Sequence, residues 1–342
     1  MKTLNKLSIP LIQGGMGVGI SLGGLAGAVA KEGGMGVIST ACIGFREPDF
    51  YENPSEAGRR ALKKEIEKAR RISCGNGMIA VNVMVATTDF EAMVLAACDY
   101  GIDAVISGAG LPLNLPKLTE GKDVLIAPIV SGKKAASMLK RMWQKRYNRL
   151  PDFFVCESSL AGGHLGFSEE DALKNTDEDS LRDLGEVIKE AGDIPVFSAG
   201  GVFDASDIKK RIELGAKGVQ IGTRFIATEE CDATEGFKKV ITEAESEDVF
   251  VLKSPVGMPG RGLRTPLMNK VSNGERKPAE RCIGCIKTCN PKETPYCISN
   301  ALIQAFYGNL EEGLFFGGSN TGRIKEIVTV KELVEELQEG WK

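Results

Sequence analysis

The chain of 342 residues contains a single histidine, His164, in the stretch SSLAGGHLGF at 158–167. Histidine is the side chain whose ordinary pKa lies near neutral pH, which suits it to give or take a proton in a reaction. The flanking glycines leave room beside the imidazole ring for a ligand. A lone histidine in a tight turn can be purely structural, but we predict that His164 is catalytic, as a base or as a residue that positions the substrate.

Two further stretches contain glycine turns whose backbone could bind an anion. In SAGGVFDASDI (198–208) a predicted strand ends at Gly200 and Gly201, and a helix opens near Asp204. Exposed backbone N–H groups in such a turn bind anions. The next predicted strand ends in GTRF (222–225), where Thr223 adds a hydroxyl. Loops after the seventh and eighth strands form the usual phosphate site of (β/α)8 barrels, so these turns predict one here, with ordinary turn glycines as the alternative.

Glycine or a small polar residue closes nearly every predicted strand, which indicates a large flat ligand that the backbone approaches closely. Glu157 ends the strand before His164; it is either an acceptor for a ligand hydroxyl or a solvated carboxylate. Asn82 interrupts the apolar run IAVNVMV, and a buried amide must find partners, which the edge of a heterocycle would supply. The predicted ligand-binding residues are Gly14, Gly15, Met16, Asn82, Ser107, Glu157, Gly162, Gly163, Gly200, Gly201, Gln220, Ile221, Gly222 and Thr223.

Four of the nine cysteines lie close together near the C-terminus, with the spacing C-x2-C-x3-C-x7-C. Four thiolates can hold zinc or an iron–sulfur cluster, but this spacing is not that of a standard zinc ribbon. Disulfides are unusual in a cytosolic chain of this size. We therefore predict reduced cysteines without a metal and keep a metal site as the alternative. The four residues are Cys282, Cys285, Cys289 and Cys297.

Short apolar segments alternate with longer amphipathic ones, a pattern typical of a parallel sheet whose two faces are both buried. Repeated junctions, such as GMGVIS at 34–39 and GAKGVQIG at 215–222, favour a closed barrel over a doubly wound sheet. The predicted fold is α/β, a (β/α)8 TIM barrel with a C-terminal extension of helices and loops. Strands are predicted at 9–15, 35–40, 78–85, 103–110, 123–130, 152–158, 194–201 and 217–225.

The pattern changes after about residue 230, so we divide the chain into a barrel at 1–230 and an extension at 231–342 that packs on it. Helices are predicted at 232–245, 297–308 and 330–340, and a Pro/Gly-rich loop at 250–267. Thr329 and Glu332 are placed as a capping box for the last helix.

Composition and motifs exclude several classes of function. A net charge of −3 gives no general attraction to nucleic acid or to anionic lipid. No apolar run approaches the ~20 residues of a membrane helix, and no cleavable leader is recognisable, so we predict a cytoplasmic protein. The chain lacks a Walker A loop and a G-x-G-x-x-G turn between strand and helix, which argues against a nucleotide hydrolase and a Rossmann unit. A homodimer stays open.

Four stretches together resemble the nitronate monooxygenase family, formerly called 2-nitropropane dioxygenases, and its relative, the FMN-dependent enoyl-[acyl-carrier-protein] reductase II. They are PLIQGGMGVGISLGGLAGAVAKEGGMGVIS, CESSLAGGHLGF, IPVFSAGGVFDASDI and GVQIGTRFIATEECDA, within about residues 5–235. The resemblance implies FMN bound non-covalently in a TIM barrel and oxidation of alkyl nitronates or nitroalkanes with O2 to a carbonyl compound and nitrite. His164 falls on the catalytic histidine of the family. Asn82, Glu157, Gly162, Gly201 and Gln220 to Thr223 fall on positions that contact the flavin.

One position departs from the monooxygenase pattern. Many monooxygenases have Gln where this chain has Glu157, whereas the reductases tend to have Glu. Two alternatives on the same FMN barrel therefore stay open: an NAD(P)H-dependent enoyl-[acyl-carrier-protein] reductase II, acting on an enoyl thioester, and an NADH:quinone reductase. A third alternative, from another class, is a flavin electron-transfer protein with a metal bound by its cysteines.

Overall fold

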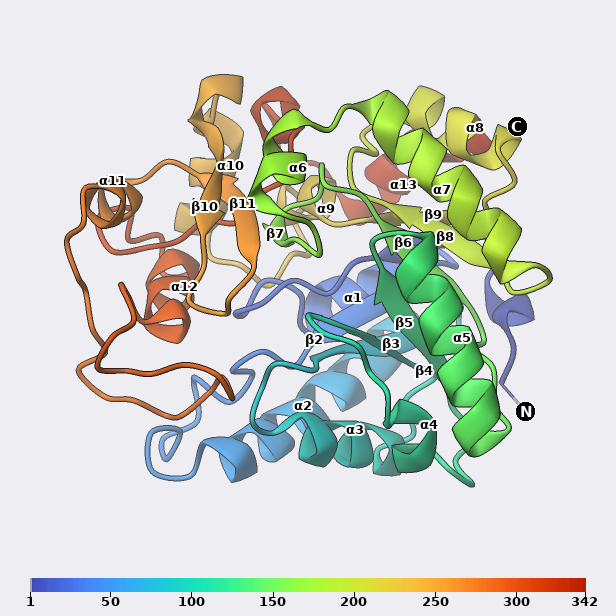
Figure 1. Cartoon of the computed structure of the whole chain (residues 1–342), viewed down its shortest axis with the longest axis horizontal. Coiled ribbons are helices and arrows are strands. Elements are labelled where there is room, and N and C mark those ends of the chain that lie inside the picture. The colour runs from blue at the N-terminus through green and yellow to red at the C-terminus, as the bar shows by residue number, and fades with distance from the viewer. Residues whose placement is uncertain (1) are drawn as a thin grey trace.

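Eight parallel strands close into a barrel in the computed structural model, which describes residues 2–342 (Figure 1). Consecutive barrel strands are neighbours, and β9 pairs with β1 to complete the circle, with Ile12 opposite Gln220. The predicted (β/α)8 barrel is confirmed. Its strands are β1 (Leu11–Gln13), β2 (Met35–Ser39), β3 (Met78–Met84), β4 (Ala104–Gly108), β5 (Leu125–Val130), β6 (Phe154–Glu157), β8 (Val196–Ala199) and β9 (Gly218–Ile221).

The barrel strands bury apolar side chains on both faces. Val37, Ala80 and Ile106 belong to the cluster that fills the barrel, whereas Ile38 and Val105 belong to the cluster between the strands and the outer helices. Neighbouring residues of a strand point to opposite faces, so one continuous apolar strand serves both layers. This double burial explains why the strands read as unbroken apolar runs in the sequence.

Helices surround the barrel and cover its strands. The long α2 turns Leu62 and Ile66 inward, spaced as one helix face requires. The amphipathic segments that the sequence places between the strands form the longer helices of this part, whereas the short α4, α6 and α9 were not predicted. The elements are the 3-10 helix η1 (Leu4–Lys6), α1 (Gly23–Lys31), α2 (Pro54–Ser73), α3 (Phe90–Asp99), α4 (Leu115–Leu118), α5 (Lys133–Tyr147), α6 (Glu169–Lys174), α7 (Asp177–Ala191), α8 (Ala205–Glu213) and α9 (Thr223–Ile226).

The C-terminal part of the chain contributes four more helices. Thr329 and Glu332 form the predicted capping box at the start of the last of them, which lies beside α8 (Figure 1). The elements are α10 (Glu235–Glu243), α11 (Pro266–Ser272), α12 (Ile298–Phe306) and α13 (Val330–Gln338), with 3-10 helices η2 (Ser246–Asp248), η3 (Thr321–Arg323) and η4 (Glu339–Trp341).

The predicted loop at 250–267 was wrong. It contains most of an antiparallel hairpin, β10 (Val249–Lys253) and β11 (Pro259–Leu263), followed by the start of α11. A two-residue strand, β7 (Gly163–His164), pairs with β11 and completes a three-stranded sheet. The glycines that suggested a loop serve close packing instead, because a Cβ on Gly262 would lie 2.5 Å from the carbonyl oxygen of Phe315.

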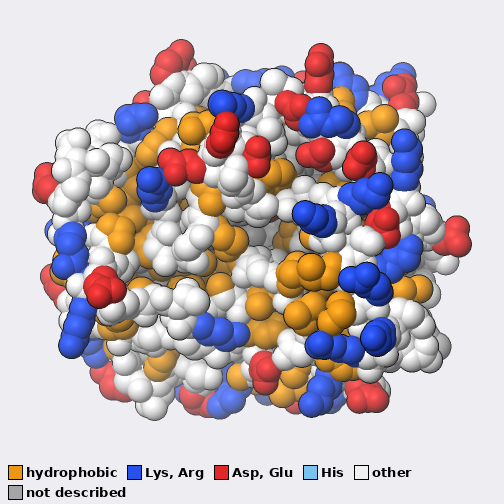
Figure 2. Space-filling view, in the orientation of Figure 1, with side chains coloured by type: hydrophobic (Ala, Val, Ile, Leu, Met, Phe, Trp, Pro, Cys, Tyr) orange, Lys and Arg blue, Asp and Glu red, His pale blue; other side chains and the backbone are white. Residues whose placement is uncertain are grey.

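The surface mixes charges of both signs, in keeping with the small net charge of −3 (Figure 2). Hydrophobic side chains gather near the middle of the face drawn in Figure 2. None of the helices that the structure describes combines the length and the apolar composition needed to span a bilayer.

Candidate functional site

A cavity of about 230 Å³ lies at the carboxyl ends of the barrel strands. It gathers nearly all the residues that the sequence predicted for the ligand, although they come from turns spread over two hundred positions. The predicted residues that line it are His164 together with Gly14, Gly15, Met16, Asn82, Glu157, Gly162, Gly163, Gly200, Gly201, Gln220, Ile221, Gly222 and Thr223.

Ser107 is the predicted residue that the structure does not bring to this cavity. Its side chain is fully buried, and its hydroxyl donates a hydrogen bond of 2.9 Å to the carbonyl oxygen of Val83. Ser107 therefore joins β4 to β3, and the next two residues, Gly108 and Ala109, line the cavity in its place.

Two glycines of the wall are required by close packing. A Cβ on Gly15 would lie 2.4 Å from the Cβ of Asn82, and a Cβ on Gly162 would lie 2.6 Å from the carbonyl carbon of Gly317. Such distances leave no space for a methyl group. The backbone at Gly15 therefore lies directly against the Asn82 side chain, and the backbone at Gly162 lies directly against that of Gly317.

One end of the cavity offers unpaired backbone donors. The N–H groups of Gly201, Val202, Gly222 and Thr223 have no acceptor among residues 2–342, and all four residues line the cavity. Gly201 has φ +73°, a left-handed conformation that glycine adopts without strain. Successive N–H groups in such turns bind the oxygens of a phosphate.

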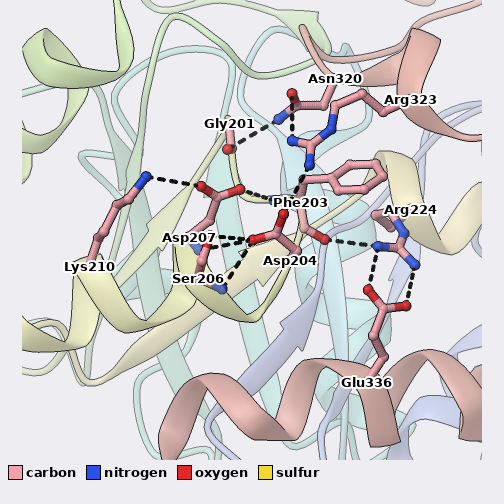
Figure 3. Close-up of polar contacts among 10 residues, drawn as sticks. All are labelled: Gly201, Phe203, Asp204, Ser206, Asp207, Lys210, Arg224, Asn320, Arg323 and Glu336. Atoms are coloured by element: carbon pink, nitrogen blue, oxygen red, sulfur yellow. Dashed lines mark hydrogen bonds and ion pairs between the residues drawn. The ribbon is translucent and has the colours of Figure 1, made fainter.

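Residues from the C-terminal part hold this end in place (Figure 3). The Thr223 hydroxyl accepts a hydrogen bond of 3.0 Å from the N–H of Gly318, which leaves its own hydrogen available for a ligand. The side-chain amide of Asn320 donates to the carbonyl oxygen of Gly201 at 3.2 Å, and Arg323 donates to Asp204, the cap of α8, at 2.9 Å.

Two guanidinium groups pack on one aromatic ring beside the same turn. Arg224 and Arg323 lie over the ring of Phe203, at 4.4 and 3.8 Å from its centroid. Arg224 also forms a two-pronged ion pair with Glu336 of α13, with distances of 3.0 and 2.8 Å. Because both arginines face carboxylates, they chiefly fix the turn, and their charge adds to the positive potential around it.

His164 lies at the other end, in β7. Its Nε2 is 2.7 Å from the hydroxyl of Ser254, in the turn between β10 and β11, and its ring meets Phe316 edge to face. Burial lowers the pKa of His164 to about 4, since the surrounding protein excludes most of the water that would solvate an imidazolium. The ring is therefore neutral at pH 7, with one N–H donor and one acceptor nitrogen.

Glu157 is shifted in the opposite direction by the same cause. Burial raises the pKa of this carboxyl to about 8, and no cation contributes to the shift. The side chain is therefore protonated at neutral pH, and a protonated carboxyl offers one donor and one acceptor. The site thus presents two neutral side chains, each able to donate and to accept.

Sequence reasoning missed a wall built by the C-terminal part. Phe316, Gly317, Gly318, Ser319 and Asn320 line the cavity, and Ser254 contacts His164. The run GLFFGGSN (313–320) carried a usable signal, since it repeats the apolar-then-glycine pattern of the barrel turns.

A second cavity of about 90 Å³ adjoins the first, and His164 lines both. Its walls are mostly apolar and include Cys42, Cys285 and Ser299. All nine cysteines are free thiols. No three ligating side chains among the described residues converge as a single metal ion requires.

Comparison with known proteins assigns the chain to a family. The family model described as "Nitronate monooxygenase" matches residues 1–340. A probable nitronate monooxygenase of Bacillus subtilis is 24% identical, over 97% of this chain and 95% of the relative. A second one, of Staphylococcus saprophyticus, is 27% identical over 55% of this chain and about half (52%) of the relative.

Two further matches carry other names. A (3aS,4S,5R,7aS)-5-hydroxy-7a-methyl-1-oxo-octahydro-1H-indene-4-carboxyl-CoA dehydrogenase of Mycobacterium tuberculosis is 25% identical, over 96% of this chain and 91% of the relative. The solved structure of FabK from Thermotoga maritima superposes with a TM-score of 0.77 at 27% identity, covering 99% of this chain and 94% of that one. The FabK structure keeps the same fold over nearly the full length of this chain. The chain is thus a flavin-dependent oxidoreductase and belongs to the nitronate monooxygenase family.

Proposed function

We propose that this protein binds FMN and oxidises alkyl nitronates with O2 to a carbonyl compound and nitrite. The observation that carries the proposal is the polarity of the cavity. One end presents four unpaired backbone N–H groups, which suit a phosphate, and the other end presents His164 and Glu157, both neutral at pH 7.

The residues present fit a flavin mononucleotide. The N–H groups of Gly201, Val202, Gly222 and Thr223 would bind its phosphate, while the amides of Asn82 and Gln220 would pair with the polar edge of its ring system. The segment 317–320 lies across the phosphate end, bonded to Thr223 and Gly201. This closure favours a mononucleotide over a dinucleotide, whose second half would need room there.

A flavin bound here would supply the oxidation of the nitronate and the reaction with oxygen. The chain itself handles the proton and the orientation of the substrate. Since Nε2 of His164 is engaged by Ser254, Nδ1 is the nitrogen left for the substrate. In its protonated tautomer Nδ1 would donate to a nitronate oxygen, and in the other tautomer it would take the α-proton of a neutral nitroalkane. Ser254 would fix the ring orientation through its contact with Nε2.

Glu157 is consistent with the monooxygenase assignment when its protonation at neutral pH is considered. A protonated carboxyl presents the same pair of one donor and one acceptor as part of a glutamine amide. At neutral pH, Glu157 would therefore replace the glutamine of many family members without placing a negative charge beside an anionic substrate.

A second candidate is the reduction of an enoyl thioester or of a quinone with NAD(P)H. It is favoured by the relative from Mycobacterium tuberculosis, whose name denotes a dehydrogenase of a CoA thioester. The apolar cavity beside His164 would suit the acyl part of such a substrate.

An anaerobic half-reaction separates the two candidates. The flavin-loaded protein is mixed, in separate cuvettes, with an alkyl nitronate, NADH or NADPH, and the flavin absorbance is followed. We expect the nitronate to bleach the flavin and both nicotinamides to leave it oxidised. Bleaching by NADH or NADPH alone would overturn the proposal in favour of the reductase.

A further inference from the structure

The four C-terminal cysteines lie on a long irregular segment that the proposed reaction does not use. Residues 273–297, between α11 and α12, contain no helix or strand. Irregular loops of this length inside a compact chain are uncommon and are usually functional. The segment contacts the barrel at Thr88, whose N–H donates to the carbonyl oxygen of Cys285 at 3.1 Å, at Thr87, which forms a bridge with Ile286, and at Glu52, which pairs with Arg281 at 2.7 Å.

Backbone contacts fold the segment so that the four cysteines lie near one another. The N–H of Cys297 donates to the carbonyl oxygen of Lys277 at 3.1 Å, which brings the end of the segment back to its start. The hydroxyl of Ser299, two residues after Cys297, lies 2.9 Å from the Sγ of Cys285. Cys289 follows Cys285 in a tight turn, in which its N–H donates to the carbonyl oxygen of Ile286 at 3.3 Å, and both cysteines pack against one apolar cluster.

Hydrogen-bond donors face two of the four sulfurs. The N–H of Gly284 lies 3.4 Å from the Sγ of Cys282, and the hydroxyl of Ser299 lies 2.9 Å from the Sγ of Cys285. Hydrogen bonds to cysteine sulfur are a standard means by which proteins tune iron–sulfur clusters. The segment 273–297 carries five Lys and Arg (276, 277, 281, 287 and 292) against three Glu (275, 280 and 293), which gives it a net positive charge beside the cysteines.

The spacing of the cysteines favours one of the two occupants that four thiolates commonly hold, zinc or an iron–sulfur cluster. A cube of four irons and four sulfides binds its cysteines at its corners and holds them further apart. The spacing C-x2-C-x3-C with a distant fourth cysteine also resembles iron–sulfur runs more than the paired C-x2-C of zinc ribbons.

We propose that Cys282, Cys285, Cys289 and Cys297 bind a [4Fe–4S] cluster through their thiolates. Cys285 also lines the cavity that adjoins the main one at His164, so the cluster lies on the His164 side of the flavin cavity. The inference rests on the cysteines and their surroundings and is independent of the nitronate chemistry.

The test is metal analysis of the flavin-loaded protein, purified without oxygen and again after reconstitution with ferrous iron and sulfide. We expect four irons and four acid-labile sulfides per chain, and an electron paramagnetic resonance signal after reduction with dithionite. The Cys282→Ser and Cys289→Ser variants should lose this iron while keeping their flavin, which shows that they fold. The matched Cys74→Ser and Cys98→Ser variants should keep both.

Three results would overturn the proposal. They are iron below stoichiometry even after reconstitution, one zinc per chain in place of iron, or iron that persists in the Cys282→Ser and Cys289→Ser variants. Should those variants fail to fold, the iron, sulfide and resonance measurements on the unaltered chain decide. The iron, sulfide and resonance measurements do not depend on nitronate turnover, so they test the cluster even if the proposed function is wrong.

Discussion

Burial alone shifts the pKa of two side chains that line the cavity, Glu157 and His164. It raises the pKa of Glu157 to about 8 and lowers that of His164 to about 4. Between these values neither group carries a charge. Because the site is neutral, little solvation energy is lost when an uncharged nitroalkane or flavin ring enters it. His164 also stays unprotonated and can act as a base.

The raised pKa of Glu157 makes the stability of the flavin-free protein depend on pH. The folded state keeps a proton on Glu157 that the unfolded state releases above about pH 4.5, so the contribution of Glu157 to stability falls as the pH rises from about 4.5 to about 8. His164, whose pKa is lowered to about 4, has the opposite effect up to about pH 6.5, so the net decline is expected between about pH 6.5 and 8. Glu157→Gln should remove this part of the decline, measured as the midpoint of urea unfolding at several pH values. Glu186→Gln, at an exposed position, is the control and should keep it. An unchanged decline in Glu157→Gln would contradict the assignment.

His164 as a base predicts a dependence on the protonation of the substrate. His164→Ala should lower kcat/KM for a neutral nitroalkane by about 10²–10⁴-fold, the usual contribution of a general base. The preformed nitronate needs no proton removed and should suffer less. Ser254→Ala should give a smaller loss with both substrates, because Ser254 only orients the ring. Full activity of His164→Ala with nitroalkane would exclude the base role.

At the scale of elements, the sequence predicted the barrel well because its signals are local. Each strand such as β3 is a short apolar run, and each helix such as α2 has one apolar face, so period and length identify them. The carboxyl ends of parallel strands share one rim of the barrel, which placed Gly15, Asn82 and Gly201 near each other without a structure.

The missed elements depend on contacts between distant parts of the chain. The pairing of β7 with β11 joins His164 to Gly260, almost a hundred residues apart, and two residues in isolation carry no strand pattern. Ser107 was misplaced for a related reason, because strand-end position does not reveal whether a side chain faces the cavity or a neighbouring strand.

The close approach at Gly15 gives a prediction for these turns. Gly15→Ala would place a Cβ 2.4 Å from that of Asn82, so the turn must shift away from the flavin. We expect weaker FMN binding by at least about tenfold and a loss of stability of about 1–3 kcal/mol, as for other overpacked sites. Gly132→Ala is the control, since no atom lies within 4 Å of its added Cβ. FMN titration by fluorescence measures the FMN affinity of Gly15→Ala and of Gly132→Ala. Equal affinities would show that the turn at Gly15 adapts to the added methyl group.

In the molecule as a whole, residues 231–342 pack against a barrel that the earlier strands already close. One apolar cluster contains Leu11 and Val219 of the barrel with Phe237, Phe315 and Leu333 of the C-terminal part. The same part also closes the phosphate end of the cavity. We propose that 231–342 is an extension that folds with the barrel at 1–230 and is not an independent domain.

This proposal predicts a single unfolding transition. Circular dichroism and the fluorescence of the two tryptophans, Trp143 in α5 and Trp341 in η4, should give coincident thermal curves. FMN at about 100 times its Kd should raise the stability by about 2.7 kcal/mol and shift both probes together. Two separate transitions, with only one of them shifted by FMN, would show that the extension folds independently.

Oxidation of alkyl nitronates by this protein is tested most directly by product analysis under air. The flavin-loaded protein is given an alkyl nitronate, and oxygen uptake and nitrite are measured; a parallel sample receives NAD(P)H and an enoyl thioester, and loss of NAD(P)H is measured. We expect oxygen uptake and nitrite formation that depend on the enzyme. We also expect NAD(P)H to be consumed no faster than in a sample that contains free flavin alone. Absence of nitrite together with rapid, thioester-dependent oxidation of NAD(P)H would contradict the proposed function.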